Sequence, residues 1–249
     1  MNEELVSIIM PAYNCEEFIK ETVDSVINQS YKNWELIIVD DCSSDNTAKI
    51  IKEYELKDNR IHYLKNEENS GAAISRNNAV KKATGRFLAF LDSDDLWRED
   101  KLKKQIEFML KNNYVFTCTA YEKIDENSVS LNRIITADLK SNYHGLLRKC
   151  PGNSTVIYDA SVLGKHFIPD IKKRNDYVMW LQIIKKAKSV YGMQEVLGSH
   201  RISAVSLSSN KKSLIKYHWY VYRKIEKLSF LYSTYLIFYW VLRAVLKFK

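Results

Sequence analysis

Apolar residues form two alternating patterns over the first hundred residues of the chain. Short, nearly continuous apolar runs predict buried strands at residues 5–11, 34–39 and 87–91, and residues 60–65 are predicted to form a shorter strand. Helical spacing of apolar positions, capping residues and glycine boundaries predict helices between these runs, within residues 15–29, 44–54 and 69–85. Strands that alternate with helices are typical of an α/β fold, in which helices cover the sheet.

The pattern is less regular in the rest of the chain. Helices are predicted within residues 98–110, 138–147 and 172–186, and strands within residues 114–121, 152–158 and 196–202. Residues 125–131 are polar and turn-like, which predicts a boundary toward the second half of the fold. We therefore expect one catalytic domain over residues 1–210, with halves at 1–100 and 101–210, and a helical extension over residues 211–249.

Three carboxylates follow the fourth predicted strand directly, at Asp92, Asp94 and Asp95. Two carboxylates about 4 Å apart repel by roughly 4 kcal/mol at an effective dielectric constant of 20. The cluster stands at a strand end, where open α/β sheets bind ligands. A divalent cation shared with a phosphate explains the cluster, and a solvated acidic turn that caps the next helix explains it equally well.

Polar residues also follow the other predicted strands. Tyr13 and Asn14 leave the first strand, and Asp40 and Asp41 end the second. Acids after the second strand can cap a helix, or they can accept hydrogen bonds from a nucleobase or ribose. The sequence has no GxGxxG between the first strand and helix, which argues against a dinucleotide site. Arg76, one turn into the helix bounded by glycines, can pair with a surface acid or with a phosphate.

Composition and charge indicate a globular protein with a basic second half. Hydrophobic residues make up 46% of the chain and charged residues 27%, which are globular values. Residues 1–100 carry 12 Lys and Arg against 20 Asp and Glu, whereas residues 101–249 carry 26 against 10. The four cysteines lack metal-ligand spacing, and the acidic N-terminus lacks a secretion signal, so a reducing, cytoplasmic location is predicted.

The last 39 residues differ in character from the rest of the chain. Between residues 214 and 228 one helical face is apolar and the opposite face carries Lys216, Arg223 and Lys227, which suits a helix at a membrane surface. Residues 230–246 are apolar but interrupted by Arg243, and a bilayer span needs about 20 apolar residues. We expect these helices to lie on the cytoplasmic membrane face, with docking on the domain as the alternative. Nucleic acid is not expected, because no recognised binding motif accompanies the basic tail.

Four ordered motifs carry a resemblance to a known family. The segments VSIIMPAYN, WELIIVDDCSSDNT, NSGAAISRNNAVKKATG and FLAFLDSDDLW resemble the nucleotide-binding half of the inverting family 2 glycosyltransferases of bacterial polysaccharide synthesis. The resemblance implies the GT-A fold, a Rossmann-like mixed β-sheet flanked by helices. It also implies a nucleotide-sugar site made by Pro11, Ala12, Tyr13, Asn14, Asp41, Arg76, Asp92, Ser93 and Asp94.

The same resemblance implies a metal ion and a catalytic base. Asp94 and Asp95 correspond to the acids that hold Mn²⁺ or Mg²⁺, and His200 is a weaker candidate ligand. The family places its base as the Asp of an acidic pair just before a helix, which corresponds to Asp176; here Asn175 replaces the preceding acid. A helix cap is the alternative role for Asp176.

The resemblance implies transfer of a sugar from a nucleotide-sugar donor, expected to be a UDP-sugar, to a hydroxyl of a lipid-linked saccharide in bacterial surface polysaccharide synthesis. Asn153, Ser154 and Thr155 could face the acceptor sugar, but ordinary hydrogen bonding within a loop is the favoured role for each of them. Arg201 with residues 203–209 could close over the donor. Two alternatives remain open. One is a nucleotidyltransferase that makes the activated sugar, and the other is a non-catalytic, membrane-bound assembly or carbohydrate-binding protein.

Overall fold

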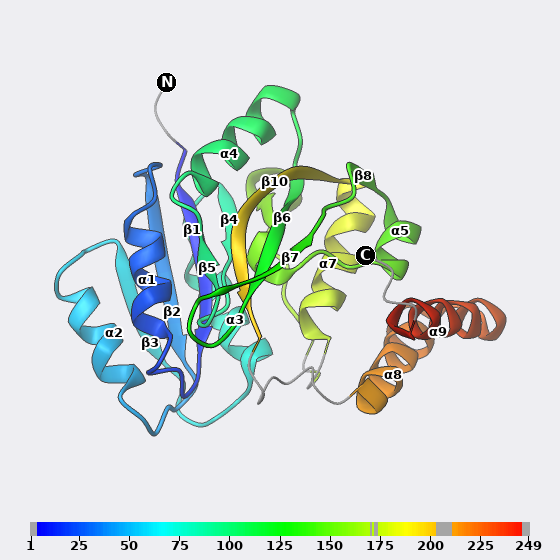
Figure 1. Cartoon of the computed structure of the whole chain (residues 1–249), viewed down its shortest axis with the longest axis horizontal. Helices are drawn as coiled ribbons and strands as arrows, with labels where there is room; N and C mark the ends of the chain where they lie inside the picture. The colour runs from blue at the N-terminus through cyan, green and yellow to red at the C-terminus, as the bar shows by residue number, and fades with distance from the viewer. Residues whose placement is uncertain (1–3, 170, 172–173, 203–210, 246–249) are drawn as a thin grey trace.

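A mixed β-sheet of ten strands runs through the computed structural model, which describes residues 4–169, 171, 174–202 and 211–245 (Figure 1). The main strand order is β3-β2-β1-β4-β9-β6-β10-β5, and β7 pairs with β6 while β8 pairs with β10. The first four strands in the chain are parallel to one another, and the strands from the second half add antiparallel pairs. The predicted mixed sheet with flanking helices is therefore present.

The first half follows the predicted alternation closely. Its strands are β1 (Val6–Ala12), β2 (Trp34–Asp40), β3 (Ile61–Lys65) and β4 (Phe87–Phe90). Its helices are α1 (Ile19–Ile27), α2 (Thr47–Glu55) and α3 (Ala72–Lys82). Every residue of β1 is buried, as expected for a strand covered on both faces. Parallel pairing of β1 with β2 and β4 brings the carboxyl ends of these strands to one edge of the sheet.

The second half departs from prediction in several elements. It contains β5 (Leu96–Trp97), α4 (Lys101–Asn112), β6 (Phe116–Ile124), β7 (Ser130–Ile135), β8 (Lys140–Ser141), α5 (Tyr143–Arg148), β9 (Ile157–Asp159), α6 (Ala160–Leu163), α7 (Asn175–Ala187) and β10 (Val190–Arg201). The polar residues 125–131 include the turn of the β6–β7 hairpin. The exposed strand β7 was missed, because five of its six residues are exposed and its pairing with β6 defines it.

Three predicted boundaries were wrong. Residues 153–155 form a 3₁₀ turn, so β9 begins only at Ile157. The helix predicted over 138–147 begins at Tyr143, because the Asn142 side chain caps it by accepting from the Gly145 N–H, and residues before it pair with β10. Strand β10 begins six residues earlier than predicted, since its parallel pairing with β6 starts at Tyr191.

Two apolar layers cover the two faces of the sheet. One layer packs α1, α2 and α4 against the side chains of β1 and β2 that face them, including Ile8, Met10 and Ile38. The other packs α3 and α7 against the opposite face, where Trp180 of α7 meets Phe90 of β4 at a ring-centroid distance of 4.9 Å. The sheet is thus the middle of three layers, and the strand ends emerge between them.

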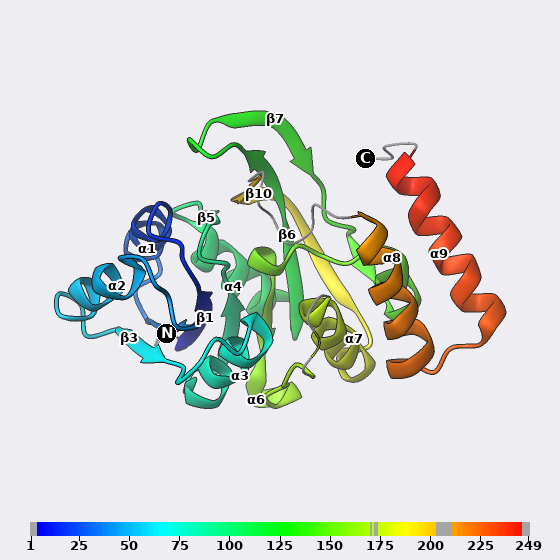
Figure 2. The ribbon, with the colours of Figure 1, turned by 90° about the horizontal axis from the view of Figure 1, so that it is seen from below.

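The C-terminal helices lie against the second half of the chain, at the end of the molecule that carries α5 and α7 (Figure 2). They are α8 (Lys211–Tyr220), a π-helical turn (Val221–Ile225) and α9 (Phe230–Val245). Leu214 and Val221 are buried, and the Tyr222 hydroxyl donates to the Leu147 carbonyl at 2.9 Å. The apolar stripe between residues 214 and 228, predicted to face a membrane, therefore packs on the protein instead.

No helix in the described part of the chain combines the length and the apolar character needed to cross a bilayer. In α9, Leu236 is buried, while Leu231, Tyr235, Phe238 and Leu242 are exposed. These four residues recur at the helical period and form one outward-facing stripe, which we call the α9 stripe.

A fully buried lysine gives the fold a measurable pH dependence. Lys101 is the first residue of α4, and its side chain is buried. Its Nζ donates to Gln105 Oε1 at 2.6 Å and lies 4.5 Å from the centre of the Trp97 ring. Burial lowers the pKa of Lys101 from 10.5 to about 7. Between these two pH values the unfolded chain binds the proton and the folded chain releases it, so stability rises with pH.

We therefore expect the free energy of unfolding of the wild type, relative to that of Lys101→Met, to increase by about 2 kcal/mol from pH 7 to pH 9. Urea unfolding at the two pH values measures the difference. Lys103→Met, an exposed change on the same helix, should show no such trend. Identical pH dependence in the wild type and Lys101→Met would contradict the assignment.

Candidate functional site

The loop after β1 and the loop after β2 are joined by hydrogen bonds at the edge of the sheet, and we call residues 13–14 and 43–44 together the ledge. The Asn14 N–H donates to Ser43 Oγ at 3.0 Å, and Asn14 Oδ1 accepts from the Ser44 N–H at 2.8 Å. Asn14 has a φ of 43°, in the left-handed region that Asn tolerates better than most residues. Pro11 and Ala12 are buried beneath the ledge, whereas Tyr13 is 51% exposed. The exposed phenol ring offers a flat surface on which a planar base can stack.

The two acids that end β2 are buried and hydrogen-bonded. Asp40 accepts from the Ser43 N–H at 3.0 Å and from the Tyr63 hydroxyl at 2.9 Å. Asp41 accepts from Asn66 Nδ2 at 2.7 Å and from two backbone N–H groups, those of Ser70 and Gly71, at 2.9 and 2.7 Å. Asp41 thereby holds the loop that leads into α3, which is the helix that carries Arg76.

Arg76 joins three distant parts of the chain. Its guanidinium donates to Asp92 Oδ1 at 2.6 Å and to Asn175 Oδ1 at 3.0 Å, and the residue is only 7% exposed. Asp92 lies just past the end of β4, and Asn175 is the first residue of α7. The half-buried Asp176 follows directly, with its N–H donating to Asn175 Oδ1 at 2.7 Å. The predicted base is therefore next in sequence to a residue tied to the acidic cluster.

Residues of the 3₁₀ turn at 153–155 also contact the cluster. Asn153 Nδ2 donates to Asp92 Oδ1 at 2.8 Å, and the Asp92 N–H donates to Ser154 Oγ at 3.1 Å. The buried Asn153 Oδ1 has no hydrogen-bond partner among the described residues. The sequence left open whether Asn153 and Ser154 face an acceptor sugar or make ordinary hydrogen bonds within a loop. Their observed contacts are with the acids, because β9 pairs with β4 and brings the turn beside the end of β4.

Asp95 is almost fully buried and holds its neighbours in place. It accepts from Ser154 Oγ at 2.5 Å and from the Arg201 N–H at 3.0 Å, and it lies 3.1 Å from His200 Nδ1. The Asp95 carboxylate is the largest cause that raises the pKa of His200, to about 9. His200 therefore lies beside the cluster through its contact with Asp95, and its role as a metal ligand stays a prediction.

Asp94 is the acid of the cluster that is least favoured as a free anion. Burial, then the neighbouring Asp95 and Asp92 carboxylates, raise its pKa to about 7. Ser93, between Asp92 and Asp94, is fixed through its carbonyl, which accepts from Thr22 Oγ1 at 3.0 Å. No group of three or more His, Cys, Asp or Glu side chains forms a ready-made metal centre in the described ranges.

Arg201 supports the acidic cluster through hydrogen bonds to Asp94 and Asp95, a role that the sequence did not reveal. Its Nε donates to the Asp94 carbonyl at 2.8 Å, and another guanidinium nitrogen pairs with Glu21 at 2.8 Å. The residue is 3% exposed, so in this conformation it is a buried support. The serine-rich segment predicted to close with it, residues 203–209, lies outside the described residues.

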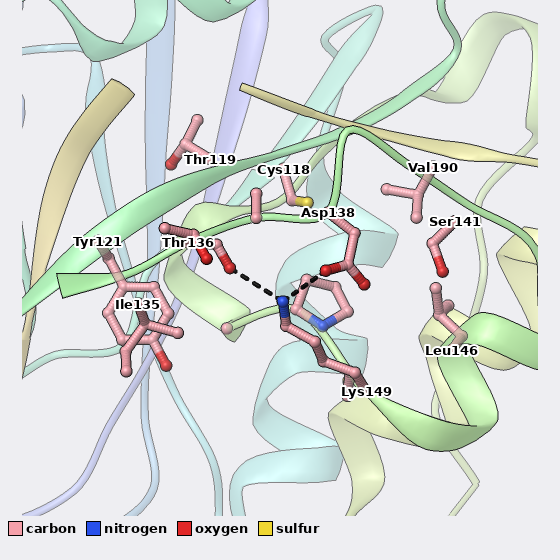
Figure 3. A pocket seen from close by; sticks show the side chains of 14 residues that line it. Cys118, Thr119, Tyr121, Ile135, Thr136, Asp138, Ser141, Leu146, Lys149 and Val190 are labelled. Atoms are coloured by element: carbon pink, nitrogen blue, oxygen red, sulfur yellow. Dashed lines mark hydrogen bonds and ion pairs between the residues drawn. The ribbon is translucent and has the colours of Figure 1, made fainter. Parts of the chain in front are cut away.

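A pocket lies beside the cluster on the β6–β7 hairpin, between it and α5 (Figure 3). Tyr121 lines the pocket and meets His200 edge-on, with ring centroids 5.8 Å apart. Lys149 also lines it, and its ammonium pairs with Asp138 at 2.6 Å and donates to the Thr136 carbonyl at 3.1 Å. The positive charge in this pocket is thus already neutralised within the chain.

Comparison with known proteins assigns the family. Residues 7–168 match the model of glycosyl transferase family 2, which is more than half of the chain. The chain belongs to glycosyltransferase family 2. Its predicted membership, and its relation to glycosyltransferases of bacterial polysaccharide synthesis, are confirmed.

Similar proteins of this family come from several bacteria. The chain is 43% identical over 244 residues to TuaG of Bacillus subtilis, a glycosyltransferase assigned by name to teichuronic acid biosynthesis, covering 98% of this chain and 97% of that protein. It is 44% identical over 221 residues to the Escherichia coli glucosyltransferase WfgD, covering 88% and 85%. The name of WfgD gives UDP-Glc as donor, α-D-GlcNAc-diphosphoundecaprenol as acceptor and a β-1,3 linkage.

Solved structures confirm the predicted GT-A fold. S. aureus TarS in complex with UDP-GlcNAc matches 96% of this chain and 72% of that one, with a TM-score of 0.71 and 19% identity. The mannosyltransferase PcManGT from Pyrobaculum calidifontis, in complex with GDP-Man and Mn²⁺, matches 86% and 62%, with a TM-score of 0.62 and 18% identity. The residue roles of this chain remain predictions.

The Arg76 bridge can be tested by a charge-conserving change. Lysine keeps the positive charge but has a single nitrogen, so Arg76→Lys loses the fork whose two nitrogens bond Asp92 and Asn175 separately. We expect UDP affinity, measured by calorimetry, to fall about tenfold or more, since a hydrogen bond to a charged group contributes about 1.5–3 kcal/mol. Arg60→Lys is the matched control, because Arg60 pairs with Asp58 just before the edge strand β3, and it should leave UDP affinity unchanged. Unchanged affinity in Arg76→Lys would refute the role of the bridge.

Proposed function

We propose that this chain is an inverting glycosyltransferase that moves glucose, or a related hexose, from a UDP-sugar to a lipid-diphosphate-linked sugar. The observation that carries the proposal is the Arg76 link from Asp92 to Asn175, which ties the start of α7, and with it Asp176, to the acidic strand end. The extensive match to WfgD, whose name specifies these substrate classes, supports the choice of donor and acceptor. Synthesis of a surface polysaccharide is the corresponding biological role.

Donor binding is assigned to the ledge and the acidic strand end. The exposed Tyr13 ring stacks on the uracil base, and Pro11, Ala12 and Asn14 shape the loop beneath it. Asp41, which already accepts three hydrogen bonds, keeps one lone pair for the base and positions α3. Arg76, Asp92, Ser93 and Asp94 complete the site toward the ribose and the diphosphate.

The residues at the strand end fit a divalent cation. Burial, and then the neighbouring Asp95 and Asp92 carboxylates, raise the pKa of Asp94 to about 7, and the buried Asn153 Oδ1 lacks a partner among the described residues. Oxygen ligands of this kind suit Mg²⁺ or Mn²⁺, which commonly bind one or two carboxylates together with substrate phosphates. Asp94 is the best-placed ligand and His200 a second; Asp95 has three contacts within the chain, one of which positions His200. A bound cation would neutralise charge on the departing diphosphate.

Asp176 is assigned the role of general base. Its carboxylate accepts the proton of the acceptor hydroxyl while that oxygen attacks the anomeric carbon, on the face opposite the UDP leaving group. Asn175 and Arg76 orient the start of α7 and so aim this carboxylate. Displacement from one side inverts the anomeric centre, so an α-linked UDP-sugar gives a β-glycoside, in agreement with the linkage in the name of WfgD.

The base assignment predicts a selective loss of turnover. Asp176→Asn should lower kcat with UDP-glucose and a GlcNAc-diphosphate lipid by about 10²–10⁴-fold, because the amide cannot take the proton. UDP affinity should stay within about twofold of the wild type, and Asp58→Asn on the distant edge should retain full turnover. Equal kcat in Asp176→Asn and the wild type would remove the base assignment. Pyrophosphate release from UTP and a sugar phosphate would instead indicate a nucleotidyltransferase.

We also propose that the α9 stripe attaches the enzyme to the cytoplasmic face of the membrane that carries its acceptor. Leu231 is 81% exposed and Phe238 65% exposed, and both belong to one outward-facing stripe. A lipid-linked acceptor cannot leave the bilayer surface, so an enzyme that adsorbs there meets it at high local concentration. The basic residues of the C-terminal segment add attraction to anionic lipid.

Membrane attachment can be tested with vesicles that contain anionic phospholipid. The double variant Leu231→Ser/Phe238→Ser should bind them at least about tenfold more weakly, since burying each side chain contributes about 1.5–3 kcal/mol. The control Leu56→Ser/Leu139→Ser removes two other exposed leucines, which are 88% and 72% exposed, and should bind like the wild type. Equal loss in both double variants, or in neither, would contradict attachment through α9.

A further inference from the structure

Three basic side chains form a row across neighbouring strands beside the acidic cluster. In the sheet register, His200 of β10 pairs with Lys123 of β6, and Lys123 pairs with Arg133 of β7. Residues paired in this way project from the same face of a sheet. Neighbouring strands lie about 4.8 Å apart, so the row extends roughly 10 Å from His200 to Arg133. It starts at the residue that contacts Asp95 and ends at the exposed Arg133.

The outer two members of the row have no anionic partner within the described chain. Neither Lys123 nor Arg133 makes an ion pair or a side-chain hydrogen bond there. Glu122 projects from the opposite face of β6, where it pairs with Arg98 at 2.7 Å and accepts from Ser199. By contrast, Lys149 in the adjacent pocket is paired with Asp138. Among the described residues, Lys149 is therefore neutralised by an acid, whereas Lys123 and Arg133 on the hairpin are not.

This arrangement is unfavourable for the chain alone. Like charges directly opposite each other on paired strands are destabilising. Burial, and then the Arg133 charge, lower the pKa of Lys123. An anion placed between the two side chains would remove the repulsion and accept hydrogen bonds from both. Arginine in particular presents a planar fork that matches the oxygens of a phosphate.

Arg243 of the C-terminal extension adds a further positive charge on this side of the molecule. The pKa of Tyr121 is raised to about 12, chiefly by burial, and the charges of Arg133 and Arg243 oppose this rise. Tyr121 projects from the same face of β6 as Lys123, two residues away. Arg243 belongs to α9, the helix whose exposed stripe is assigned above to the membrane. The helix thus combines a cation whose charge acts at this face of β6 with an apolar stripe that faces solvent.

We propose that Lys123 and Arg133, assisted by Arg243, bind the diphosphate of the lipid-linked acceptor. The inference rests on the proposed function and adds the acceptor subsite. One sugar ring separates the attacking hydroxyl from the diphosphate in a monosaccharide-diphosphate lipid. The row spans a comparable offset from the donor end at His200.

Steady-state kinetics with two water-soluble acceptors test the proposal without a membrane. One acceptor is a short-chain alkyl diphosphate GlcNAc, and the other is an alkyl GlcNAc glycoside that lacks phosphate; UDP-glucose is the donor. For K123Q/R133Q we expect the KM for the diphosphate acceptor to rise at least about tenfold, with kcat within about twofold. The KM for the uncharged acceptor should not change. K123Q/R133K should have a KM for the diphosphate acceptor between those of the wild type and K123Q/R133Q, since lysine restores the charge at residue 133 without the fork.

A matched control removes two positive charges elsewhere. K103Q/K111Q changes two exposed lysines of α4 and should leave the KM for both acceptors as in the wild type. An equal rise in KM for both acceptors in K123Q/R133Q would show a general structural effect and overturn the proposal. An unchanged KM for the diphosphate acceptor, together with weaker binding to anionic vesicles, would assign the row to lipid headgroups and overturn it as well.

A binding measurement separates failure of this inference from failure of the proposed function. Calorimetric titration with a short-chain alkyl diphosphate requires no turnover. Binding by the wild type and at least about tenfold weaker binding by K123Q/R133Q would support the diphosphate subsite even if UDP-glucose were not the donor. Equal binding by the two proteins, or none by the wild type, would overturn the subsite and leave the assignment of Asp176 untouched.

Discussion

The buried contact of Arg76 with Asp92 and Asn175 is the interaction on which the site depends. It joins a helix of the nucleotide-binding half, the end of the central strand β4 and the first residue of α7. A buried guanidinium requires anionic or carbonyl partners, because an unpaired charge in the interior is strongly destabilising. The bridge therefore does two things at once. It stabilises the packing of the two halves of the sheet. It also fixes the position of the first turn of α7, which carries Asp176.

The acids at the end of β4 have different environments, although they lie within four residues. Asp92 is paired with Arg76, and Asp95 is surrounded by donors from Ser154, His200 and Arg201. Asp94 has a raised pKa, because it is buried beside the other two carboxylates. The outer acids thus act as supports, and the middle one is held where an added positive charge is most favourable. Such a division is typical of sites in which a supporting shell aims a small number of functional groups.

The C-terminal helices connect the site to the surroundings of the molecule. The turn after α8 packs into the core through Val221 and Tyr222, so α9 is carried at a fixed position on the domain. One side of α9 meets the protein through Leu236, and the opposite side exposes the α9 stripe. The basic row of β6 and β7 extends outward from the acidic cluster through His200. An acceptor with an apolar chain, a diphosphate and a sugar matches a protein that has these three surfaces.

The sequence by itself determined the elements whose signal is local. Continuous apolar runs located β1, β2 and β4, because burial on both faces demands apolar side chains at nearly every position. The motifs around Asp41, Arg76 and Asp92 likewise indicated the family and the edge of the sheet where its chemistry lies. Tertiary structure decided what depends on distant partners. Arg201, Asn153 and Ser154 support the acids only because β10 and β9 bring them there, and the stripe of α8 faces the core because α7 offers it an apolar surface. Amphipathic spacing shows that a helix has an apolar face, but only the neighbouring surface determines what covers it.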